Sequence, residues 1–136
     1  MRFETPDFSI KKKQITEILS ESFLKHFPEF ALNNKLRKAI GTPQSILFSH
    51  EIDQTHLYFE FDCGTWGPGR WSGIMIGTSE PSFLLELQQY LPNDLTFYVT
   101  TQELSNQCET ILPFLRKFSR PIFEMILKIG KKKLDY

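Results

Sequence analysis

Cysteine, long apolar runs and recognisable catalytic motifs are all scarce in this 136-residue chain. The two cysteines, Cys63 and Cys108, form no Cys-x-x-Cys pair, which excludes a zinc ribbon and a thioredoxin-like site. No apolar stretch approaches the roughly 20 residues that span a bilayer, and residues 1–13 lack the apolar core of a secretory signal peptide. We therefore expect a cytoplasmic protein with reduced thiols and no membrane segment.

Motifs that bind nucleotides or activate a serine are absent as well. The chain has no G-x-G-x-x-G after a strand, no Walker loop and no G-x-S-x-G elbow, and we expect no cofactor. It does contain a large apolar fraction, because 40% of the residues are hydrophobic and 13 are phenylalanine. A chain of this length and composition builds one core, so we expect residues 1–136 to form a single domain.

Lysine and arginine are almost missing from the middle of the chain, although the whole chain carries no net charge. Residues 39–115 contain one basic residue, Arg70, against nine acidic residues, and the other basic residues gather in residues 1–38 and 116–136. This asymmetry favours an acidic surface that binds a basic protein partner. It disfavours specific nucleic-acid binding, because basic and aromatic residues do not interleave along one element. The alternative is that the basic ends fold back over the middle, or that the charges are simply solvated.

Apolar residues at three- and four-residue spacing predict helices on both sides of a strand-rich middle. We expect helices at 9–27, 79–91 and 101–118, and a last helix from about 121 to 129 that leads into a mobile basic tail, 131–136. Pro28 should end the first helix, and Pro113 should kink or divide the third. Residues 29–41 allow either a short helix capped by Gly41 or a strand at 30–32.

Alternating apolar and polar residues predict the sheet. We expect strands at 45–52, 56–63, 71–77 and 95–99. In the second strand Leu57 and Phe59 alternate with Tyr58 and Glu60, so the first pair should face the core and the second pair solvent or a ligand. Because the strands cluster and short polar connections join them, the sequence predicts an α+β fold. The sheet should have about four strands, be mostly antiparallel, and have helices packed against it.

The segment between the second and third predicted strands, residues 63–71, is the most distinctive in the chain. Its glycines and its proline require tight backbone geometry, and Trp66 and Arg70 belong to the residue types most enriched in binding hot spots. One interpretation is a recognition loop in which both side chains anchor a partner. The other is a hairpin loop with Trp71 in the core and Arg70 in a salt bridge.

Two carboxylates, Glu60 and Asp62, lie two residues apart on the second predicted strand and therefore point to the same face. With His56 on that face and His50 across the hairpin, a metal site or an acid–base pair is geometrically conceivable. The chain nevertheless lacks a complete ligand set at usable spacing. We therefore expect Glu60 and Asp62 to face solvent and to bind no metal.

Tyr58-Phe59-Glu60-Phe61 and Gly69-Arg70-Trp71, set between an N-terminal helix and a helical C-terminal half, resemble segments of small bacterial immunity-type proteins and of uncharacterised α+β proteins from mobile gene cassettes. The resemblance implies a non-enzymatic protein that masks a basic toxin by binding it. We expect a binding protein whose partner surface contains Glu51, Tyr58, Glu60, Asp62, Trp66 and Arg70. Two alternatives remain: a small ligand- or metal-dependent enzyme that uses Glu60, Asp62 and a histidine, and a structural homodimer.

Overall fold

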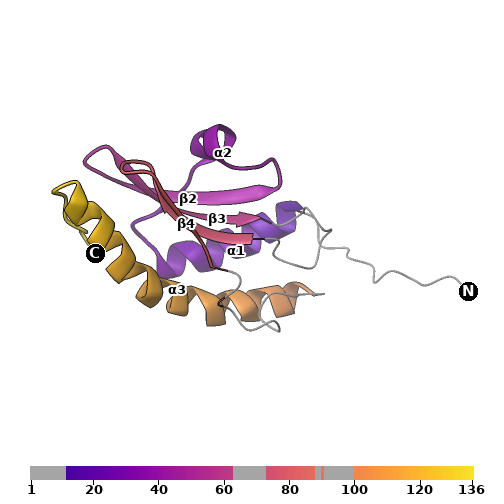
Figure 1. The fold of residues 1–136 in the computed structure, drawn as a ribbon. Coiled ribbons are helices and arrows are strands. Elements are labelled where there is room, and N and C mark those ends of the chain that lie inside the picture. The colour runs from indigo at the N-terminus through magenta and orange to yellow at the C-terminus, as the bar shows by residue number, and fades with distance from the viewer. Residues whose placement is uncertain (1–11, 63–72, 88–89, 91–99) are drawn as a thin grey trace, which may run out of the picture.

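The computed structural model describes residues 12–62, 73–87, 90 and 100–136, and the fold of these residues is α+β (Figure 1). The described elements are, in chain order, α1 (Lys12–His26), β1 (Ala31–Leu32), α2 (Asn34–Ile40), β2 (Ser45–Ile52), β3 (Thr55–Asp62), β4 (Gly73–Thr78), β5 (Phe83–Glu86) and α3 (Thr101–Ile129). The predicted strand at 95–99 lies outside the described residues. None of the described helices is both long enough and apolar enough to cross a membrane.

The described strands form one sheet in the order β1-β2-β3-β4-β5, and every neighbouring pair is antiparallel. This confirms the predicted mostly antiparallel sheet and its central hairpin. The turn between β2 and β3 consists of Asp53 and Gln54, whose φ angles are 47° and 71°. Two consecutive positive φ angles match the right-handed twist of a tight hairpin. The turn therefore fixes a register in which Ser45 faces Asp62 and Ile52 faces Thr55.

Phenylalanine builds the core between the sheet and the two long helices. Phe48, Phe59 and Phe61 project from one face of the hairpin, and each is at most 1% exposed. Phe23 of α1 stacks on Phe48 with 4.0 Å between the ring centroids, and Phe123 of α3 meets Phe59 edge-on at 5.7 Å. Figure 1 shows α1 and α3 on this side of the sheet and α2 on the other. We call the side toward α1 and α3 the inner sheet face and the opposite side the outer sheet face.

Residues 29–41 contain both structures that the sequence allowed. The short strand β1 pairs with β2, and α2 follows it directly. The side chain of Asn33 accepts a hydrogen bond from the Leu36 amide at 2.9 Å and so caps the start of α2. The Gly41 amide donates to the Arg37 carbonyl at 2.7 Å at the other end. Between these two caps α2 packs against β2 on the outer sheet face.

The predicted division of the C-terminal helix is wrong, because α3 runs without interruption through Pro113 and Pro121. Each proline removes one backbone donor and bends a helix, and Figure 1 shows α3 changing direction along its length. The predicted start is confirmed, because the Thr100 side chain accepts the Glu103 amide at 3.1 Å. Packing of the long apolar stripe against the sheet and α1 outweighs the two lost hydrogen bonds.

The predicted helix at 79–91 is also wrong where the chain is described, because residues 83–86 form the edge strand β5. Phe83 pairs with Thr78 and Leu85 with Ile76, which extends the antiparallel ladder from β4. The turn before it is held by Thr55 Oγ1, which donates to the Glu80 carbonyl at 2.9 Å. Pairing with β4 therefore outweighs the local preference of Ser79 and Pro81 for the start of a helix.

The C-terminal segment is not the mobile basic tail that the sequence predicts. The Lys132 ammonium donates to the Asp53 carbonyl and to Thr55 Oγ1, both at 2.6 Å. Asp135 accepts a hydrogen bond from His50 at 2.8 Å, and the Arg116 guanidinium lies 4.7 Å from the centre of the Tyr136 ring. These contacts fasten residues 131–136 across the hairpin end of the sheet.

Candidate functional site

The predicted partner surface is partly assembled on the outer sheet face. Tyr58, Glu60 and Asp62 alternate with the core residues of β3, so all three side chains share this face. Glu51 joins them from β2, because it pairs with the outer-face residue His56. The two loop residues of the prediction, Trp66 and Arg70, lie outside the described residues.

Glu60 is buried, which corrects the expectation that it faces solvent. Only 6% of the residue is exposed. Gly41 lies directly over its carboxyl group, since a Cβ at residue 41 would overlap Glu60 Oε2 and the Ser45 hydroxyl. Burial raises the pKa of Glu60 above its usual range, a hydrogen bond from Ser45 opposes that rise, and the charge of Asp62 adds to it. Asp62 itself is half-buried.

Tyr58 lies flat against β4 beside Glu60. A Cβ on Gly77 would overlap the end of the Tyr58 ring and its hydroxyl, so only glycine leaves room for the ring at this position. The residue is 8% exposed, and burial raises the pKa of its hydroxyl, with a further contribution from the charge of Glu60. The outer sheet face thus holds an aromatic hydroxyl over β4 and a carboxyl group beside Gly41 and Ser45 in fixed positions.

An apolar patch continues the outer sheet face over β4 and β5. Met75 pairs with both Glu60 and Glu86, and its side chain is half-buried. Leu84, which pairs with Gly77, is 59% exposed. The sequence reasoning missed Leu84 and Glu86, because it assigned residues 79–91 to a helix and the four-residue segment Phe83–Glu86 shows only a weak alternation.

The charges on the outer sheet face separate into two regions. Four carboxylates lie on the face: Glu51, Glu60, Asp62 and Glu86. The strand segments 45–62 and 73–86 contain no lysine and no arginine. The basic residues nearby belong to α2, which carries Lys35, Arg37 and Lys38 and packs against β2. The acidic region therefore extends over β3–β5 and includes Glu51 near the turn end of β2, and α2 forms a basic margin along β2.

The two histidines do not both lie beside these carboxylates, as the alternative metal or acid–base site would require. His50 pairs with Leu57 and lies on the inner sheet face, where it bonds to Asp135 at 2.8 Å. Only His56 shares the outer sheet face with Glu60. Among the described residues, no group of three histidine, cysteine, aspartate or glutamate side chains is arranged to hold a metal ion. The enzyme alternative would therefore have to rest on Glu60, Asp62 and His56 alone.

Cys108, the described cysteine, is unsuited to nucleophilic chemistry. Its thiol is free and buried among the core residues of α3. Burial raises its pKa to about 12, so the reactive thiolate is essentially absent at neutral pH. Cys63 lies outside the described residues.

Comparisons with protein-family models, with curated proteins and with solved structures give no match to this chain. The arrangement of side chains is therefore the sole basis for a functional conclusion. On the outer sheet face that arrangement combines carboxylates, a fixed tyrosine and an exposed apolar patch, which suits binding of a cationic and partly apolar surface better than bond-breaking chemistry.

Proposed function

We propose that this chain is a non-enzymatic binding protein that receives a basic segment of a protein partner on its outer sheet face, in the way that an immunity-type protein masks a toxin. The observation that carries the proposal is the acidic region of the outer sheet face, where Asp62 and Glu86 lie beside Met75, Leu84 is exposed, and the strand segments contain no lysine or arginine. Charged groups around an apolar centre are the usual anatomy of a protein interface.

The two kinds of residue contribute differently to binding. The carboxylates attract a basic partner during the approach and so raise the association rate at low salt. Leu84 and Met75 bury apolar area after docking and so slow dissociation. Tyr58 offers only a small contact, because its ring lies against the sheet over Gly77 and the residue is 8% exposed. We propose Trp66 and Arg70 as further anchors from the loop between β3 and β4.

The test uses the protein product of a gene adjacent to the one encoding this chain, purified and titrated against the full chain at about 50 and 200 mM salt, a range over which surface charges are increasingly screened. The charge variant is Glu51→Lys on the outer sheet face, and its matched control is Glu17→Lys on α1, which makes the same charge change at another exposed site. Glu51→Lys should slow association about tenfold at low salt and reduce the salt dependence. Glu17→Lys should do neither.

The apolar contribution is tested with Leu84→Ser, and the matched control is Leu24→Ser, because Leu24 is an exposed leucine on α1. Leu84→Ser should raise the dissociation rate several-fold while leaving the thermal melt unchanged. Equal effects of the two leucine variants, or of the two glutamate variants, would show that the partner binds elsewhere. A product of small-molecule turnover that disappears in Glu60→Gln would instead support the enzyme alternative.

A further inference from the structure

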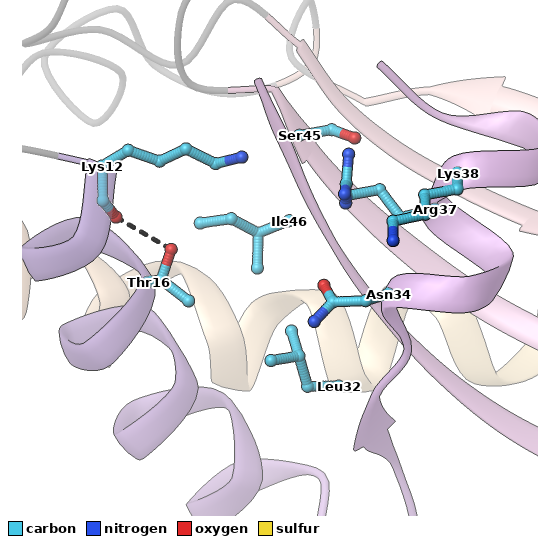
Figure 2. A pocket seen from close by; sticks show the side chains of 8 residues that line it. All are labelled: Lys12, Thr16, Leu32, Asn34, Arg37, Lys38, Ser45 and Ile46. Atoms are coloured by element: carbon cyan, nitrogen blue, oxygen red, sulfur yellow. Dashed lines mark hydrogen bonds between the residues drawn. The ribbon is translucent and has the colours of Figure 1, made fainter. Parts of the chain in front are cut away.

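A second feature lies outside the acidic region, at the edge of the sheet next to β1. A cavity of about 240 Å³ opens between the first turn of α1, the helix α2 and the beginning of β2 (Figure 2). Three cationic side chains line it: Lys12 from α1, and Arg37 and Lys38 from α2. Figure 2 shows the Lys12 ammonium and the Arg37 guanidinium reaching into the space from opposite sides. Lys12 is 25 residues before Arg37 in the sequence, and the fold brings it close to the adjacent pair Arg37 and Lys38.

The three positive charges are not balanced by acids in the described structure. No aspartate or glutamate is among the described residues that line the cavity, and none of the salt bridges of the described chain includes Lys12, Arg37 or Lys38. Glu60, whose carboxyl group lies under Gly41, does not line the cavity. Like charges around one space repel each other, and an anion in that space would relieve the repulsion.

Two of the cations are held in place by neutral acceptors. The Lys12 ammonium donates to the Pro43 carbonyl, and Arg37 Nη1 donates to the Thr42 carbonyl at 3.2 Å. A backbone carbonyl orients a cationic side chain without cancelling its charge. Both groups therefore keep unused donors, because an ammonium has three and a guanidinium has five. The cavity is thus prepared for an anion before the anion arrives, which lowers the ordering cost of binding.

The remaining lining residues narrow the chemistry of the ligand. Asn34 adds a side-chain amide, whose NH2 group is a donor that suits phosphate oxygens, whereas the Ser45 hydroxyl already donates to the Thr42 carbonyl at 2.8 Å. Leu32 and Ile46 form an apolar wall beside them. The volume lies below the roughly 300–1,000 Å³ of cavities that hold drug-sized ligands. Arginine in a fixed fork geometry together with lysine is the usual pair for a phosphate group.

We propose that this cavity binds the phosphate group of a small phosphate monoester, with Arg37 and Lys12 as the principal contacts and the apolar wall against the organic part. This site shares no lining residue with the acidic region, so the proposal stands or falls independently of the proposed protein partner.

The experiment titrates the full chain with ribose 5-phosphate, with inorganic phosphate and with ribose at about 20 mM salt, using calorimetry and amide chemical shifts. Ribose 5-phosphate should bind saturably with a dissociation constant below about 10 mM, and ribose should not bind. The shifts should concentrate on Asn34, Arg37 and Lys12. Inorganic phosphate should bind more weakly, because it leaves Leu32 and Ile46 uncovered.

The variants distinguish binding in the cavity from non-specific attraction to the basic charge of α2. Arg37→Gln and Lys12→Gln should each weaken ribose 5-phosphate binding about tenfold, the effect expected for one charge-assisted hydrogen bond. The matched control is Lys35→Gln, which removes one charge from the same helix outside the cavity and should change binding less than twofold.

Three results would overturn the proposal. One is no saturable binding of ribose 5-phosphate below about 10 mM. Another is a loss of ribose 5-phosphate affinity in Lys35→Gln equal to that in Arg37→Gln, which would show that the basic charge of α2 attracts the anion non-specifically. The third is tight binding of a single-stranded oligonucleotide that ribose 5-phosphate does not compete with, which would identify a nucleic-acid surface instead. Thermal melts of Arg37→Gln and Lys12→Gln show whether each variant is folded. The two residues lie on different helices, so weaker binding by both folded variants is attributed to the cavity and not to unfolding.

Discussion

Single residues set the shape of the outer sheet face, and glycine matters there as much as the carboxylates. Gly77 leaves room for the Tyr58 ring and Gly41 for the carboxyl group of Glu60. The alternation in β3 predicted which side of the sheet Glu60 faces, because that depends on local geometry. It could not predict that Glu60 is buried, because the burial comes from Gly41 at the end of α2, which the local pattern of β3 does not encode.

Gly77→Ala should destabilise the protein through steric overlap with Tyr58. We expect the free energy of unfolding to fall by about 1–3 kcal/mol, the usual range for overpacking a well-packed site. The control is Gly73→Ala on the same strand, where a Cβ would make ordinary contacts at 3.7 Å with Met75 and 3.9 Å with Asp62. This control should leave stability nearly unchanged or slightly raised, because alanine restricts the unfolded chain. Urea unfolding distinguishes the two, and equal losses would contradict the steric argument.

Glu60 should make the protein less stable as the pH rises. In the unfolded chain the residue ionises at its ordinary pKa of 4.5, whereas burial raises the pKa in the folded state. Between these two pKa values the unfolded chain gives up a proton that the folded chain keeps, so increasing pH favours unfolding. The stabilising contribution is therefore complete below pH 4.5 and lost as the pH rises through the folded-state pKa.

Glu60→Gln removes this pH dependence. The melting temperature of the variant should therefore rise relative to that of the wild type as the pH increases from 4 to 8. The exposed residue Glu51 provides the control, because Glu51→Gln should follow the wild-type profile. Melting curves that run parallel for Glu60→Gln and wild type across this range would show that the carboxyl group is solvated rather than buried.

At the scale of elements, the contact between α1 and α3 is organised around Glu109. Ser22 donates its hydroxyl to Glu109 Oε1 at 2.8 Å, His26 Nε2 lies 2.9 Å from Oε2, and the Lys25 ammonium lies 3.5 Å from Oε2. The hydrogen bond from His26, followed by the one from Ser22, lowers the pKa of Glu109 to about 2. One carboxylate on α3 therefore gathers three side chains from the last turns of α1.

Glu109→Gln should destabilise the protein at pH 6 and lose its effect in acid. The stabilisation is present above the ordinary pKa of 4.5 and disappears as the pH falls toward about 2, where the folded state also takes up the proton. Glu109 is 43% exposed, so we expect only about 0.2–1 kcal/mol at pH 6, as for other solvent-exposed ion pairs. Urea unfolding at pH 6 and pH 2.5 measures the difference, with the exposed Glu17→Gln as control. A difference of the same size at pH 2.5 as at pH 6 would mean that the carboxylate charge is not the cause.

Elements with an unambiguous period were predictable from the sequence, and elements decided by distant contacts were not. The hairpin of β2 and β3 and the helix α1 followed directly from their alternation and their apolar stripe. The strand β5 did not, because Ser79 and Pro81 resemble a helix start and only the pairing with β4 decides otherwise. The helix α3 continues through Pro113 because it packs along the whole core, which its local sequence does not reveal.

For the whole molecule, the uneven charge along the sequence becomes an arrangement in space. Part of the C-terminal basic segment does fold back, since Lys132 bonds to the carbonyl of Asp53 at the β2–β3 turn. Arg116 also pairs with Glu29 through two hydrogen bonds of 2.8 and 3.0 Å. Lys132 and Arg116 make these contacts outside the acidic region. Lys12, Arg37 and Lys38 line one cavity at the edge of the sheet next to β1. The sequence predicted the segregation of charge but not the cation-lined cavity, which requires the positions of three separate elements.

Because α3 follows all the described strands in the sequence, it also affects folding during synthesis on the ribosome. When β2–β5 have emerged from the ribosome, their inner face displays Phe48, Phe59 and Phe61, and of the two described helices that cover this face α1 alone has emerged. The 43 residues from the end of β5 to the end of α3 follow at about 5–20 residues per second, so the apolar face stays partly uncovered for roughly 2–9 s. During those seconds the nascent chain presents phenylalanine-rich strands to any chaperone waiting at the tunnel exit.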